Sequence, residues 1–181
     1  MALWPYRFEA ATARLRAVAW RLRGLAAGAG AAVHGGVRLR FGAACALGER
    51  SVLYRDVQIL ATGQGRFRIG RDSHLAPGAY LLVGGQTLDI GDDVAIGPGL
   101  MLFCESNDAE PDGLFRTQYR RAPVSIGSNV FIGARVTVLP GAVIEDHVVI
   151  AAHAVVIGRL ASGWVYGGCP ARPLRALAAP S

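Results

Sequence analysis

Large apolar residues recur at every sixth position in the second half of the chain. Between residues 126 and 161 they are Ile126, Ile132, Val138, Ile144, Ile150 and Val156. Smaller apolar residues stand four positions after the first five of them, at Val130, Val136, Ala142, Val148 and Ala154. A short fixed period is typical of a solenoid, in which each repeat packs against its neighbours. We therefore predict one short strand and one turn per hexad, an inward side chain at its first position, and one triangular coil for every three hexads.

The same register extends upstream and is interrupted once by a long insert. It recurs at Ile90, Ile96 and Leu102, at Ile69, Leu75 and Leu81, and less regularly at Leu47, Leu53 and Ile59. It breaks after Leu102 and resumes at Ile126, so residues 108–123 are predicted to leave the coil as a polar excursion loop. Long loops on a rigid framework usually carry function, and a tolerated insertion is the alternative.

The N-terminal segment has a different period. From Tyr6 to Ala27 we predict a helix, because apolar residues recur near helical spacing among arginines, at Leu15, Val18, Trp20, Leu22 and Leu25. The helix would cover the open end of the coil, lie on an anionic membrane, or do both. The predicted organisation is a basic helical cap over residues 1–32, a β-helix over 33–162 and a C-terminal tail over 163–181.

The composition suits a narrow repetitive core and restricts the partners. The 181 residues fit one domain, and 52% are hydrophobic but only 8% aromatic, so small and β-branched residues dominate. The net charge of +6, with arginine supplying every positive charge, is compatible with nucleic acid, anionic lipid or a phosphate-bearing ligand. No basic motif interleaved with aromatic residues accompanies it, so we expect no nucleic-acid partner.

The cysteines and the first residues bear on metal binding and location. Cys45, Cys104 and Cys169 are widely separated, which gives no metal-binding spacing and an odd number for disulfides. A reducing compartment is the simplest interpretation. The first residues lack the apolar core of a secretory leader, and no apolar run approaches the ~20 residues of a membrane span. We expect a cytoplasmic protein, or one at the inner face of the membrane, without a metal ion.

Three runs in the C-terminal half carry a resemblance to a known family. They are Val124-Ser-Ile-Gly-Ser-Asn-Val-Phe-Ile-Gly-Ala134, Val149-Ile-Ala-Ala-His-Ala-Val-Val156 and Trp164-Val-Tyr-Gly-Gly-Cys-Pro-Ala-Arg172. The chain resembles the hexapeptide-repeat acyltransferases, in particular the maltose and galactoside O-acetyltransferase group and its relatives that modify surface polysaccharides. The resemblance covers roughly residues 69–175, and Cys169 stands where the family's closing motif has Asn.

The resemblance implies an all-β fold, a left-handed parallel β-helix, assembled as a homotrimer with acyl-CoA bound between neighbouring prisms. It implies transfer of an acetyl group from acetyl-CoA to a sugar hydroxyl in surface-polysaccharide biosynthesis. The acceptor would be a saccharide or lipid-linked saccharide, and an amino-sugar amine is the alternative. The cofactor-binding positions that it implies are Phe131 (in place of a family Trp), Gly133, Ala134, Ala152 and, on the phosphate side, Arg172 and Arg175.

The resemblance also implies a histidine base just before the excursion loop, and here the chain departs from the family. The matching residue is Asn107, whose side chain has no titratable nitrogen. Three alternatives stay open. In the first, a carboxylate, Glu105 or Asp108, replaces the base. In the second, a histidine reaches the site from an adjacent subunit; His74, which we place at a turn, is favoured over His34, His147 and His153. In the third, the site no longer catalyses, and the trimer binds or scaffolds a partner.

Overall fold

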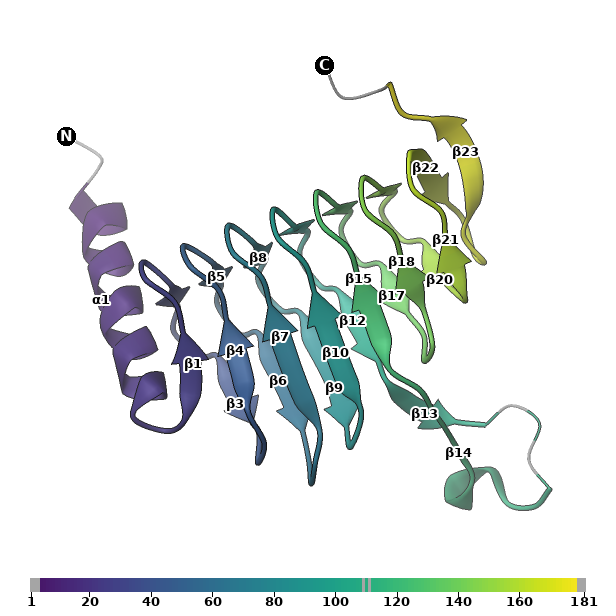
Figure 1. The fold of residues 1–181 in the computed structure, drawn as a ribbon, viewed down its shortest axis with the longest axis horizontal. Helices are drawn as coiled ribbons and strands as arrows, with labels where there is room; N and C mark the ends of the chain where they lie inside the picture. The colour runs from purple at the N-terminus through teal and green to yellow at the C-terminus, as the bar shows by residue number, and fades with distance from the viewer. Residues whose placement is uncertain (1–3, 109, 111, 179–181) are drawn as a thin grey trace.

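The chain folds into a triangular β-prism with one helix across its N-terminal end (Figure 1). The computed structural model describes residues 4–108, 110 and 112–178, with residues 4–10 described by their backbone alone. Figure 1 shows the chain rising along one sheet, crossing the upper edge and descending along the sheet behind while it advances toward the C-terminus. This sense is left-handed, opposite to the usual right-handed crossover between parallel strands. The predicted fold class is confirmed.

Three parallel sheets form the sides of the prism. Sheet A contains β1 (Leu25–Ala27), β4 (Cys45–Leu47), β7 (Arg66–Ile69), β10 (Thr87–Ile90), β15 (Val124–Ile126), β18 (Val143–Ile144) and β21 (Arg159–Leu160). Sheet B contains β2 (Ala32–Val33), β5 (Val52–Leu53), β8 (His74–Leu75), β11 (Ala95–Ile96), β16 (Phe131–Ile132), β19 (Val149–Ile150), β22 (Trp164–Gly167) and the antiparallel β23 (Arg172–Ala176). Sheet C contains β3 (Arg38–Arg40), β6 (Gln58–Ala61), β9 (Tyr80–Gly84), β12 (Met101–Phe103), β17 (Thr137–Val138) and β20 (Val155–Val156). We name the prism edges A–B, B–C and C–A after the sheets that their turns connect.

The core is a set of in-register stacks of the residues that open each hexad. Ile69, Ile90, Ile126 and Ile144 pair along sheet A, and the equivalent residues of sheets B and C pair in the same way. Every hexad-opening residue named above is buried, as the register predicts. Because similar aliphatic side chains stack directly on one another and protein interiors are close-packed, the core cannot accommodate a substitution that changes side-chain volume greatly.

The turns depend on left-handed backbone and on close approach. Edges A–B and B–C carry non-glycine residues at positive φ between 51° and 61°, at Arg50, Asp56, Asp72, Asp93, Asn129, Arg135, His147 and His153. Asn and Asp tolerate this conformation best, because their short polar side chains bond locally. Glycine is required where coils nearly touch: a Cβ on Gly133 would lie 2.5 Å from the backbone nitrogen of Ala152.

The structure corrects the predicted boundaries at both ends. Helix α1 (Trp4–Arg21) ends before Ala27, because Gly24 adopts φ +98° and Leu25 enters sheet A opposite Cys45. The first coil therefore begins at residue 25 rather than 33. At the other end, β22 is the last parallel strand of sheet B, so the coil continues past 162 before β23 turns back.

The excursion is a hairpin that starts before the predicted residue 108. Strands β13 (Glu105–Asn107) and β14 (Tyr119–Arg121) pair antiparallel at edge C–A, with the 3-10 turn η1 (Phe115–Thr117) between them. Figure 1 shows this hairpin extending away from the prism near its middle. The register break after Leu102 thus marks a structured arm.

Replacing Ser73 by alanine is expected to lower the free energy of unfolding by about 1–3 kcal/mol, because a buried hydrogen-bond relay would be broken. The Ser73 hydroxyl donates to the carbonyl of Gly91 at 2.9 Å and accepts the N–H of Val94 at 3.0 Å. Urea unfolding followed by circular dichroism measures the change. Ser162→Ala is the control, because Ser162 is exposed; an equal loss in both variants would contradict the relay.

Candidate functional site

A row of outward side chains runs along sheet B. The strand register aligns His74, Ala95, Phe131, Val149 and Val165 on successive strands, and Arg175 of β23 follows Val165. Phe131 is 50% exposed, so its ring is available as a contact surface. Because neighbouring strands lie about 4.8 Å apart, Phe131 and Arg175 are separated by about 14 Å. The row is long enough to follow an extended ligand.

Edge B–C borders this row and carries glycine and alanine beside the longer side chains of Arg135 and His153. Gly97 and Gly133 directly follow the inward residues of β11 and β16, and a Cβ on Gly97 would lie 2.8 Å from the nitrogen of Ala134. The coils therefore pack backbone to backbone along this edge. At the next turn position, Ala134 and Ala152 have amide N–H groups that donate to no backbone carbonyl within the described part of the chain. Each of these amides lies against a glycine of the preceding coil, Gly97 and Gly133 respectively.

Two arginines lie at the C-terminal end of the sheet B row and of edge B–C. In the β22–β23 pair, Arg175 lies opposite Val165 and Arg172 opposite Gly167, and both arginines are exposed. Guanidinium groups bind phosphate through forked, charge-assisted hydrogen bonds. The structure thus brings all six predicted cofactor-side residues onto one face and its bordering edge.

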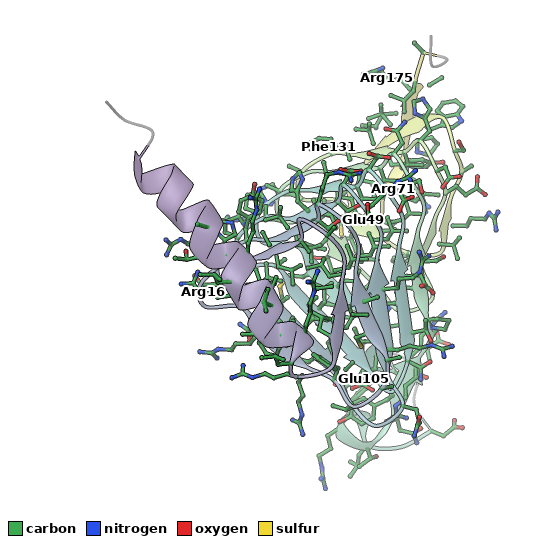
Figure 2. All side chains as sticks on the ribbon, turned by 60° about the vertical axis from the view of Figure 1, so that its left-hand side comes forward. Arg16, Glu49, Arg71, Glu105, Phe131 and Arg175 are labelled. Atoms are coloured by element: carbon green, nitrogen blue, oxygen red, sulfur yellow. The ribbon has the colours of Figure 1, made fainter. Side chains whose placement is uncertain are left out.

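The predicted catalytic residues lie elsewhere in the protomer, on the hairpin at edge C–A. Figure 2 shows Glu105 at the corner opposite Phe131 and Arg175. The carboxylate of Glu105 is 3.5 Å from Nε of Arg121 on the partner strand, and it occupies the space that a Cβ on Gly84 would need. Glu105 therefore joins the hairpin to the coil.

The other two candidates also hold the hairpin. Nδ2 of Asn107 donates to the carbonyl of Phe115 at 2.7 Å, which fixes the 3-10 turn η1. The carboxylate of Asp108 accepts the N–H of Glu110 at 3.2 Å. Within one protomer, therefore, the predicted catalytic and cofactor-side residues are not brought together.

His74 occupies a place that the sequence analysis misassigned. It lies in strand β8 rather than at a turn, on the same outward row as Phe131 and two strands from it, about 10 Å away. Ala95 stands between the two rings with only a methyl group. The Tyr54 ring contacts the imidazole edge-on with centroids 5.9 Å apart. Partial burial lowers the pKa of His74 below its ordinary value of 6.5, which favours the neutral imidazole.

The remaining histidines do not lie in the row, although His153 follows Ala152 on edge B–C. His147 and His153 are turn residues at φ 54° and 61°, as their place in the hexad predicts. His34 stacks on Tyr54 with ring centroids 5.0 Å apart, near the N-terminal end of the prism. The hexad register could have identified His74, because it precedes inward Leu75 as Phe131 precedes inward Ile132.

Sheet C presents an apolar outer patch that the sequence analysis missed. Tyr80 and Met101 lie in one outward row and Leu82 and Phe103 pair in the next, while Gln58 and Thr137 continue the first row on either side. By contrast, the outer face of sheet A carries Arg68, Asp89 and Arg159. An exposed apolar patch of this kind is typical of a protein contact surface.

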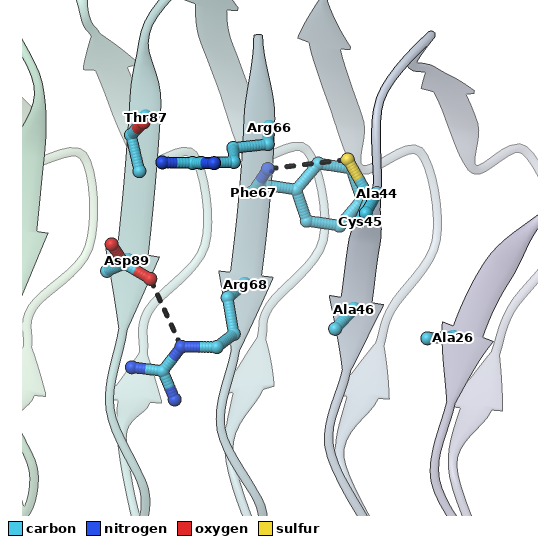
Figure 3. Close-up of a pocket in the computed structure, with 9 residues that line it drawn as sticks. All are labelled: Ala26, Ala44, Cys45, Ala46, Arg66, Phe67, Arg68, Thr87 and Asp89. Atoms are coloured by element: carbon cyan, nitrogen blue, oxygen red, sulfur yellow. Dashed lines mark hydrogen bonds and ion pairs between the residues drawn. The ribbon is translucent and has the colours of Figure 1, made fainter. Parts of the chain in front are cut away.

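An open hollow of about 330 Å³ on sheet A is separate from both clusters (Figure 3). Its floor includes Ala26 and Ala46, and Arg68 at its side donates to Asp89 at 3.1 Å. No predicted site residue lines it. The two buried thiols are equally remote from a reactive role: burial raises the pKa of Cys45, and it raises that of Cys104 to about 12.

One segment of the chain matches a hexapeptide-repeat family, and the chain is similar to a galactoside O-acetyltransferase. Residues 123–158 match the family described as bacterial transferase hexapeptide (six repeats). Galactoside O-acetyltransferase of Escherichia coli (strain K12) is 30% identical over 114 residues, which cover 60% of this chain and 56% of the relative. The chain spans about half the length of the curated relatives it matches. The predicted resemblance to hexapeptide-repeat acyltransferases is confirmed.

Solved structures share the fold. A variant of AntD, an N-acyltransferase from Bacillus cereus, in complex with dTDP-4-amino-4,6-dideoxyglucose and coenzyme A superposes with a TM-score of 0.80 at 19% identity, covering 88% of each chain. The hexapeptide-repeat acetyltransferase VCA0836 of Vibrio cholerae O1 biovar eltor, complexed with acetyl coenzyme A, gives a TM-score of 0.58 at 24% identity, covering 83% of this chain and 73% of the other. At these identities the likeness establishes the fold.

Proposed function

We propose that this protein transfers an acetyl group from acetyl-CoA to a sugar hydroxyl. The observation that carries the proposal is the alignment of Phe131, Gly133, Ala134, Ala152 and the two C-terminal arginines along one face and edge. The arginines suit the phosphates of the cofactor. The similarity to galactoside O-acetyltransferase supports a saccharide acceptor. By analogy with that group, the acceptor is a saccharide or lipid-linked saccharide of surface-polysaccharide assembly.

The active assembly that we propose is a homotrimer. The apolar outer patch of sheet C, with Tyr80, Met101 and Phe103, supports packing of each prism against its neighbours, and cyclic closure buries one such patch per subunit. Assembly also offers a way to bring the excursion hairpin of one subunit beside the sheet B row of the next. The hairpin residues Glu105, Asn107 and Asp108 would then border the acceptor rather than supply the base.

The base that we propose is His74. Neutral imidazole takes the proton of the sugar hydroxyl as its oxygen attacks the thioester carbonyl carbon. Backbone N–H groups donate to the oxyanion that forms. Collapse of the tetrahedral intermediate breaks the carbon–sulfur bond, and the imidazolium returns its proton to the departing CoA thiolate. The Phe131 ring, beyond Ala95, supplies an apolar surface at the acyl end of the cofactor.

Calorimetric titration with acetyl-CoA tests the cofactor claim. We expect binding by the wild type and an increase in Kd of about tenfold for each of Arg172→Ala and Arg175→Ala, the scale of one charge-assisted hydrogen bond. Arg66→Ala, on sheet A, is a matched control that should bind like wild type. Absence of binding to the wild type at about millimolar acetyl-CoA, the upper end of ordinary KM values, would contradict the proposal.

A catalytically silent binding trimer is the second candidate, and Asn107 is the observation that favours it. Turnover of acetyl-CoA with a panel of sugars and amino sugars separates the two candidates, because acetyl transfer by the wild type excludes the silent one. The same panel distinguishes a hydroxyl acceptor from an amine. Asn107→His provides a further comparison: a gain in activity over an inactive wild type would support loss of catalysis in this chain.

A further inference from the structure

Helix α1 presents a second apolar stripe on the face turned away from the prism. Its inner face packs on the first coil through Ala13 and Ala17, which are 0% and 3% exposed. On the opposite face, Leu15, Val18 and Leu22 are 69%, 48% and 86% exposed. Their spacing of three and four residues places them on one line along the helix. Leu22 continues this line beyond Arg21 because its N–H still bonds the Val18 carbonyl at 3.2 Å.

Arginines flank this apolar stripe on both sides. Helical spacing places Arg14 and Arg21 along one side and Arg16 and Arg23 along the other, and all four are exposed. The segment 11–23 contains no acidic residue. Arg21 also anchors the helix, since its guanidinium donates to the carbonyls of Ala27 and Gly28 at 2.8 and 2.7 Å. The apolar stripe is therefore fixed facing outward, with exposed arginines on both sides.

A small hollow beside the stripe adds a place for an anion. It encloses about 100 Å³ between α1 and the first coil, and Arg14, Val18 and Arg21 contribute to its lining. The Arg14 guanidinium and an apolar rim match a phosphate that continues into hydrocarbon, beside Arg21, which is bonded to the first coil. Helical order, an exposed apolar stripe and flanking arginines together are the features of a helix that lies in a lipid interface.

We propose that α1 docks the protein on an anionic phospholipid surface, with Leu15, Val18 and Leu22 in the acyl boundary and the arginines at lipid phosphates. No helix in the described part of the chain is long and apolar enough to cross a bilayer. The contact is therefore in the plane of the membrane. Because α1 lies across the end of the prism, the row on sheet B extends away from the lipid and stays accessible (Figures 1 and 2).

Flotation with phosphatidylcholine vesicles, with and without phosphatidylglycerol, tests this proposal. We expect the full chain to bind vesicles that contain phosphatidylglycerol and to be released by high salt. The double variant Leu15→Ser/Leu22→Ser should reduce the partition coefficient by about tenfold or more, because both side chains would lose apolar burial. Arg14→Gln/Arg16→Gln should reduce it by about fivefold for each charge.

The excursion hairpin offers a matched control. Leu114 and Phe115 are each 62% exposed, so Leu114→Ser/Phe115→Ser removes comparable apolar surface away from α1 and should bind like wild type. Thermal unfolding verifies that each variant is folded. Three results would overturn the proposal: no wild-type binding to phosphatidylglycerol vesicles, unchanged binding by the folded leucine variant, or an equal loss in the hairpin variant. If the apolar stripe of α1 instead bound a protein partner, the wild type would not bind phosphatidylglycerol vesicles.

Discussion

Replacing His74 by asparagine is expected to lower kcat for acetyl transfer by about 10²- to 10⁴-fold, the usual contribution of a general base. Asparagine keeps the approximate size of the side chain but cannot accept the hydroxyl proton. The affinity for acetyl-CoA should stay close to that of the wild type, because His74 lies about 10 Å from Phe131 on the row. Steady-state kinetics and calorimetry on the same preparations separate the two quantities.

Two control variants make this result specific. His147→Asn changes a turn residue on edge A–B, away from edge B–C, and should leave kcat unchanged. Glu105→Gln removes the ion pair with Arg121 and should alter KM for the acceptor more than kcat, because the hairpin loosens. If Glu105→Gln abolished turnover while His74→Asn did not, a carboxylate base would be supported and our assignment of His74 would be wrong.

The pH dependence provides an independent test of His74. Burial lowers the pKa of His74, so the neutral imidazole persists below pH 6.5, and the acid limb of kcat/KM should lie below that value. The same shift affects stability, because the unfolded chain takes up the proton more readily than the folded one. The free energy of unfolding should therefore fall as pH drops below about 6.5, and this component should be missing in His74→Asn.

Replacing Ile132 by alanine is expected to lower the free energy of unfolding by about 2–5 kcal/mol. Ile132 is 0% exposed and stacks between Ile96 and Ile150 along sheet B, so truncation leaves a cavity that the neighbouring coils cannot close. The same change should weaken acetyl-CoA binding, because Phe131 and Gly133 are adjacent in the chain. Chemical unfolding and calorimetry measure both effects.

Ile157 provides the comparison for this core substitution. It is 55% exposed, and Ile157→Ala should change the free energy of unfolding by no more than about 0.5 kcal/mol. Similar losses for Ile132→Ala and Ile157→Ala would mean that the hexad stacks do not form the stabilising core.

The coil could be predicted because its signal is local and repeated. Ile126, Ile132 and Val138 each begin a hexad and are each buried, since a short solenoid repeat relates sequence position directly to direction. The excursion was found as a break in that register. Its internal pairing was not, because the contacts that hold it join the Asn107 side chain to the Phe115 carbonyl and Glu105 to Arg121, and these contacts have no periodicity in the sequence.

The sequence by itself determined the β-helix, because its signal lies within single hexads. The six cofactor-side positions are what the family resemblance implies. Only the tertiary structure decided how those positions combine. Stacking of coils about 4.8 Å apart places His74, from an early coil, on one row with Phe131 and with Arg175 from the last strand. It also places Glu105, Asn107 and Asp108 on a different edge, because the turn that carries them joins sheet C to sheet A. The apolar stripe of α1 faces outward for the same kind of reason: Ala13 and Ala17 fit the flat end of the prism, and that packing fixes where Leu15 and Leu22 lie.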